Sequence, residues 1–186
     1  IYCVGTLNVT GTDFIENIGQ YGGAIIAYGA DITITECNFS KNTSTSGIGG
    51  AMYIRSGDSE DLVSTVTITD SSFTENSSTG SGGALYIKAG SSVTINGSTF
   101  TGNTAVNSGG AIYCLGTISG SGNTFTGNTT SSETKDGGGA IYVSAGNVSL
   151  EDTDFVNNSA KFYGGAIYAQ DSVLSFDGCE FNGNTA

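Results

Sequence analysis

Short runs of alternating apolar and polar residues follow one another along the chain. Leu85–Lys88 and Val93–Asn96 are two of them. A period of two is typical of a β-strand with one buried face. Clusters of Gly, Ser, Thr and Asn separate the runs, and none of the runs is long enough for a helix. The pattern therefore predicts an all-β chain made of short strands.

Two motifs alternate along these runs and mark an internal repeat. The motif Phe-x-x-Asn occurs seven times, and Gly-Gly-Ala occurs six times, with steps of 27, 33, 27, 29 and 26 residues. A repeat of this length that contains only short strands is typical of a coil with about one turn per repeat. We therefore predict a right-handed parallel β-helix of six to seven turns of about 27 residues, forming a single domain over residues 1–186. The longest steps predict surface insertions near residues 57–64 and 131–137. The Gly-Gly-Ala motifs end at Ala24, Ala51, Ala84, Ala111, Ala140 and Ala166.

Stacked turns convert each repeat position into a column with a spacing of about 4.8 Å. The phenylalanines of the motif should form a buried aromatic stack: Phe14, Phe39, Phe73, Phe100, Phe125, Phe155 and Phe181. The asparagines of the motif should lie at an inner turn, where each amide can bond to the amides above and below it. They are Asn17, Asn42, Asn76, Asn103, Asn128, Asn158 and Asn184.

With both motifs, the chain resembles the polymorphic outer membrane protein repeats of chlamydiae over its whole length. The resemblance implies a β-helical, surface-displayed stalk or passenger, which in that family is part of autotransported adhesins. The repeat pattern extends from Ile1 to Ala186, with no atypical repeat at either end. Because solenoid ends normally carry capping repeats, we expect an uncapped slice of a longer array.

Composition and charge narrow the function classes. The net charge is −12, from 17 acidic and five basic residues. Nucleic acid needs a basic track to neutralise its phosphates, and an anionic membrane surface would repel this chain. No apolar run approaches the roughly 18 residues of a membrane span. The chain has no His, which excludes Ser-His-Asp and Cys-His catalysis and His-ligated metal sites. We predict neither a nucleic-acid partner nor direct membrane insertion, no cofactor and no enzymatic activity.

Acidic residues are most concentrated in the last two turns. In the repeat frame Glu151 should stack on Asp177, and Asp154 on Glu180, about one strand spacing apart. Like charges in register repel each other, so a cation such as Ca²⁺ would relieve them. These four residues are a weak calcium candidate, against the alternative of solvated surface charge. Paired carboxylates also serve glycoside hydrolysis, an alternative that ranks lowest.

Two outward columns are candidate binding faces. A row of tyrosines could stack on sugar rings, pack against another chain, or stack on itself. Thr33, Thr67 and Thr94 begin a second column that is similar to flat ice-binding faces, although the β-propensity of Thr explains it better. The tyrosine column comprises Tyr53, Tyr86, Tyr113, Tyr142 and Tyr168, with Tyr2 in the same frame.

The repeat columns also predict the positions of the cysteines and of the glycosylation sequons. Cys3 and Cys114 share one column four turns apart, and Cys37 and Cys179 share another five turns apart. These separations exceed the reach of a disulfide, so all four should be free. Asn-x-Ser/Thr sequons occur on both kinds of column. The amides of the asparagine column should be unavailable for glycosylation, whereas three other sequons should face solvent: Asn8, Asn38 and Asn96.

The leading hypothesis is a structural and adhesive segment of a large secreted or cell-surface protein, located outside the cell. Its partners would be other protein or carbohydrate surfaces, or copies of itself joined end to end or laterally. The first alternative is a protomer of an extracellular filament or appendage. A polysaccharide-active enzyme fragment is the less favoured alternative.

Overall fold

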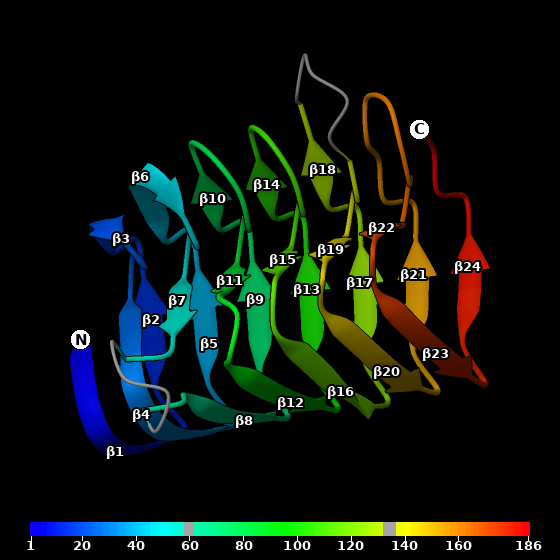
Figure 1. Ribbon diagram of the computed structural model, residues 1–186. Coiled ribbons are helices and arrows are strands. Elements are labelled where there is room, and N and C mark those ends of the chain that lie inside the picture. The colour runs from blue at the N-terminus through cyan, green and yellow to red at the C-terminus, as the bar shows by residue number, and fades with distance from the viewer. Residues whose placement is uncertain (58–61, 132–136) are drawn as a thin grey trace.

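The chain winds into a β-solenoid (Figure 1). The computed structural model describes residues 1–57, 62–131 and 137–186, and these contain strands and turns but no α-helix. Residues 58–61 and 132–136, which belong to the two predicted insertions, lie outside the described residues. Among the described residues, no helix has the length and apolarity needed to cross a membrane. The all-β, parallel β-helix prediction is confirmed.

The turns contribute strands to three parallel sheets, here called A, B and C, although the last two turns add no strand to sheet C. Sheet A has twelve strands: β1 (Tyr2–Thr10), β4 (Ile25–Thr35), β7 (Met52–Arg55), β8 (Thr65–Thr69), β11 (Leu85–Ile87), β12 (Ser92–Asn96), β15 (Ile112–Cys114), β16 (Thr117–Ser121), β19 (Ile141–Ser144), β20 (Asn147–Glu151), β22 (Ile167–Gln170) and β23 (Val173–Asp177). Sheet B has seven: β2 (Asp13–Ile15), β5 (Asn38–Ser40), β9 (Ser72–Thr74), β13 (Thr99–Thr101), β17 (Thr124–Thr126), β21 (Asp154–Val156) and β24 (Glu180–Asn182). Sheet C has five: β3 (Ile18–Tyr21), β6 (Thr43–Ile48), β10 (Ser77–Ser78), β14 (Thr104–Ala105) and β18 (Thr129–Thr130).

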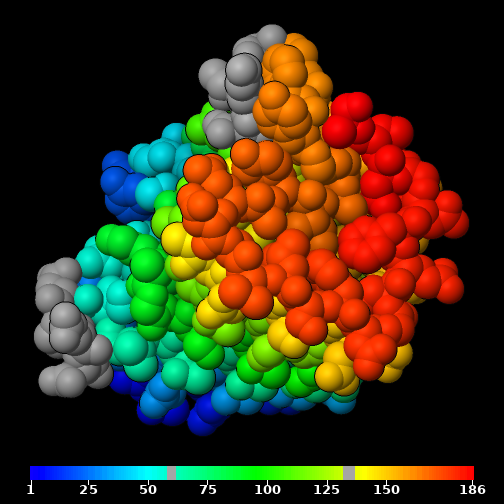
Figure 2. Space-filling view, turned by 45° about the vertical axis from the view of Figure 1, so that its right-hand side comes forward, coloured from blue at the N-terminus to red at the C-terminus, as the bar shows by residue number. Residues whose placement is uncertain are grey.

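Equivalent residues of successive turns pair in register. Phe100 pairs with Phe73 on one side and with Phe125 on the other, and Tyr86 pairs with Tyr53 in the same way. The colours in Figure 2 accordingly run in layers, and the last turn forms one end of the molecule. Because the sequence repeat and the structural repeat coincide, each motif position becomes a continuous column.

The space between the three sheets is filled by these columns. Inward-facing Ile, Leu, Val and Met side chains of sheet A are almost fully buried in the central turns, and so are the five central phenylalanines. Adjacent phenylalanine rings lie 4.6–5.0 Å apart between centroids and are tilted by at most 8°. Phe14 in the first turn is half-buried, and Phe181 in the last turn is 50% exposed. The core is therefore one long aromatic and aliphatic stack.

The two glycines of Gly-Gly-Ala have different tasks. Gly49, the first of its pair, has a φ of 60°, a conformation that glycine adopts without steric cost. Gly50, the second, lies so close to the next turn that a Cβ would collide with the carbonyl oxygen of Gly83 and the amide nitrogen of Ser77. Ala51 is fully buried. The motif thus combines a left-handed turn with a close backbone contact between coils.

Candidate functional site

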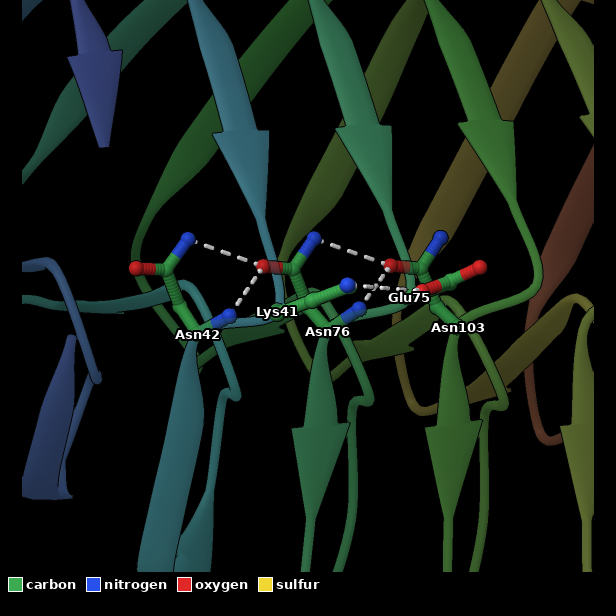
Figure 3. Close-up of polar contacts among 5 residues, drawn as sticks. All are labelled: Lys41, Asn42, Glu75, Asn76 and Asn103. Atoms are coloured by element: carbon green, nitrogen blue, oxygen red, sulfur yellow. Dashed lines mark hydrogen bonds and ion pairs between the residues drawn. The ribbon is translucent and has the colours of Figure 1, made fainter. Parts of the chain in front are cut away.

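An asparagine ladder runs along the corner between sheets B and C (Figure 3). Asn76 Nδ2 donates to Asn103 Oδ1 at 3.0 Å and to the carbonyl oxygen of Phe39 at 2.9 Å. The same Asn103 Oδ1 also accepts the Asn76 backbone N–H at 3.0 Å. The pattern repeats from Asn17 to Asn184, and the ladder side chains from Asn42 to Asn158 are fully buried. These amides are consumed by the fold and are closed to a ligand or a glycan.

A charged column lies on the surface beside the ladder. Lys41 and Glu75 form an ion pair with 3.9 Å between Nζ and Oε2, and more than half of each side chain is exposed. Figure 3 shows the pair next to the buried amides. Glu16, Lys41 and Glu75 all have φ near 55°, so this column is also a left-handed corner. An ion pair this exposed contributes little to stability.

A second polar ladder lies in the column that contains Cys37 and Cys179, which was predicted from the sequence, although its hydrogen bonds were not. It lies two residues before each motif phenylalanine. The backbone N–H of Cys37 donates to Ser71 Oγ at 3.1 Å, and the backbone N–H of Ser71 donates to Ser98 Oγ at 3.1 Å. Ser98 N–H continues the chain to Asn123 Oδ1 at 3.0 Å. The signal that marks it is a small polar residue at the same place in nearly every repeat.

The predicted tyrosine column exists; its rings stack on one another from Tyr86 to Tyr168, whereas Tyr53 meets Tyr86 edge to face. Tyr86 and Tyr113 have centroids 4.6 Å apart, and Tyr113 and Tyr142 have centroids 4.8 Å apart with a tilt of 3°. Tyr53 and Tyr142 are only 9% and 8% exposed, whereas Tyr86, Tyr113 and Tyr168 are half-buried. Neighbouring rings occupy most of the ring faces. A sugar therefore cannot stack on the faces of the inner rings. Only the ring edges remain available for contact with a partner.

The outward side of sheet A carries the Thr- and Ser-rich face. Thr33, Thr67 and Thr94 are in register on β4, β8 and β12, and the column continues through Ser119. The hydroxyl oxygens of Thr94 and Ser119 are 3.2 Å apart. The column therefore presents small hydroxyl side chains in regular steps.

The four acidic residues fall into two separate pairs. Glu151 is in register with Asp177 on sheet A, and Asp154 is in register with Glu180 on sheet B. Within residues 1–57, 62–131 and 137–186, no group of three or more His, Cys, Asp or Glu side chains is arranged to hold a metal ion. The geometry gives stacked like charges rather than a coordination shell.

Replacing Glu151 with Gln should stabilise the protein, because it removes one charge of a stacked like-charge pair. We expect a gain of roughly 0.2–0.5 kcal/mol, within the range for cross-strand pairs. The matched control is Glu75→Gln, which removes the partner of Lys41 and should be neutral or slightly destabilising. Urea denaturation followed by circular dichroism measures both. The gain should shrink in 1 M NaCl, where the screening length is about 3 Å; a gain that persists in high salt contradicts the electrostatic cause.

The four cysteines are free, as the column separations predict. Cys3, Cys37 and Cys114 are buried, and Cys179 is half-buried. Burial raises the pKa of the Cys114 thiol to about 12, an effect that a backbone hydrogen bond with Gly116 partly opposes. Burial also raises the pKa of the Tyr53 and Tyr86 phenols above 10.0. These groups remain protonated in the folded protein at pH values where they ionise in the unfolded chain.

The protein should therefore lose stability in alkali. A thiol whose pKa is raised in the folded state contributes its full stability below the unfolded pKa of 9.0 and loses it as the pH rises toward 12. We expect about 1 kcal/mol to be lost between pH 8 and pH 10 through Cys114, given about 1.4 kcal/mol per pKa unit. Urea midpoints at the two pH values give the loss. Cys114→Ala should flatten this dependence; an unchanged slope in that variant contradicts the assignment.

The three predicted solvent-facing sequons differ in exposure. Asn8 is exposed, whereas Asn38 and Asn96 are half-buried. Asn38 Oδ1 accepts a hydrogen bond from Ser72 Oγ at 3.0 Å, and Asn96 Oδ1 accepts one from the Ser121 backbone N–H at 3.1 Å. All three lie outside the asparagine ladder, and their glycosylation stays a prediction.

Four segments of the chain match the Chlamydia polymorphic membrane protein repeat. They span residues 70–88, 97–115, 124–144 and 152–170. Each segment runs from just before a Phe-x-x-Asn motif to just after the following Gly-Gly-Ala motif. No curated protein and no solved structure matches the chain. The matched unit thus contains the aromatic column, the asparagine ladder and the glycine corner.

Proposed function

The chain carries Chlamydia polymorphic membrane protein repeats, and from this premise we propose that it is an adhesive segment of a cell-surface protein. The β-solenoid serves as a rigid spacer and display scaffold, and the outward columns contact the partner. About seven turns at a strand spacing of about 4.8 Å give a rod on the order of 30 Å long. The partner is a protein or carbohydrate surface outside the cell.

One observation supports this proposal above the others: the motif residues are buried, while residues between the motifs face outward. Phe73, Asn76 and Ala84 are fully buried, and Gly83 has no room for a side chain. Thr67 and Thr94 project from the opposite side of the strands that bury Val66 and Val93. A solenoid of this kind leaves its outward columns available as an extended binding surface, as display requires.

A non-catalytic role is consistent with the position of the carboxylates. Glu151, Asp177 and Glu180 are exposed on the outward side of the strands. Charged groups in open water stabilise a transition state far less than groups held in a water-excluded site. Exposed carboxylates of this kind are better suited to contact with a partner surface than to bond cleavage.

Location and adhesion can be tested separately. Antibodies against the chain should label intact cells of the source organism; labelling only after permeabilisation contradicts the surface location. Beads coated with the purified chain should adhere to target cells more than beads coated with albumin; equal adhesion contradicts the adhesive role.

Two variants distinguish the candidate faces. A Thr67→Lys/Thr94→Lys variant changes the face of sheet A, and Tyr86→Ala opens the tyrosine column. Circular dichroism spectra confirm that both variants fold. We expect one of the two variants to reduce bead adhesion at least fivefold. Full adhesion by both variants contradicts a role for these faces.

A further inference from the structure

We draw no further inference here: the strongest candidate, the groove of about 280 Å³ at the corner between sheets A and B lined by Glu36, Asp70 and Cys37, is an acidic cluster beside a single cysteine, and no second observation among the described residues points to a ligand.

Discussion

Replacing Phe100 with alanine should destabilise the protein by about 3–5 kcal/mol, the usual loss for a buried Phe→Ala change. Phe100 is fully buried, and its ring lies 4.7 Å from the rings of both Phe73 and Phe125. Alanine would leave a cavity in the middle of the aromatic column and remove two stacking contacts. Because small domains have only about 5–15 kcal/mol of stability, this is a large fraction of the total.

The same substitution at an exposed site provides the control. Phe162 is 42% exposed, so Phe162→Ala should cost far less than the core variant. Urea denaturation followed by circular dichroism gives the free energy of unfolding of both variants. Equal losses at Phe100 and Phe162 would show that the aromatic column is not the main source of stability.

Replacing Asn103 with alanine should cost on the order of 3 kcal/mol or more, because several buried polar groups lose their partners at once. Asn103 Oδ1 accepts the backbone N–H and the side-chain amide of Asn76. Asn103 Nδ2 donates to Asn128 Oδ1 and to the carbonyl oxygen of Phe73, each at 2.9 Å. Removal of one side chain therefore breaks the ladder on both sides. Hydrogen exchange at the Asn76 amide should accelerate together with the loss of stability.

Two further variants separate hydrogen bonding from packing. Asn103→Asp preserves the size of the side chain but exchanges the donor for an acceptor and buries a charge, which is costly without a partner. It should destabilise at least as much as alanine does. Asn107→Ala, at an exposed asparagine, should change the free energy of unfolding by less than about 0.5 kcal/mol. An Asn103→Asp variant as stable as the parent chain would contradict the ladder.

The fold was predictable because its main determinants recur in the sequence at a fixed place. A phenylalanine every turn forms an aromatic column only if the turns stack in register, and the paired Gly-Gly-Ala motif indicates where each turn closes. The in-register pairing of Phe73 with Phe100 is the direct result. The matched repeats cover the same motifs.

Sheet C was not predictable, because its strands are too short to show a period. Ser77–Ser78 and Thr129–Thr130 contain two residues each, and no alternation can be recognised over two positions. The strands of sheet B, of three residues each, were likewise not predicted as separate strands. Backbone pairing with the adjacent turn, rather than the local sequence, specifies these strands.

The left-handed corners could not be predicted from the sequence for a different reason. Glu75 and Gly102 occupy the same corner with φ values of 54° and 62°, but only glycine signals such a conformation in a sequence. The exposure of the tyrosines could likewise not be predicted from the sequence. Tyr53 is buried partly against Tyr21, whose ring centroid is 6.1 Å away, and this contact joins two turns.

Distances between spin labels on one outward column test the stacked, in-register solenoid most directly. In a chain whose four cysteines are replaced by alanine, one label is placed at Asn8 and the other at Ser119, Ser149 or Ser175. These positions follow one another in register on successive turns, and Asn8 begins the same column through Thr33. Pulsed electron paramagnetic resonance should give distances of about 19, 24 and 29 Å, rising by about 4.8 Å per turn. Distances that do not rise in equal steps would contradict the stacked solenoid.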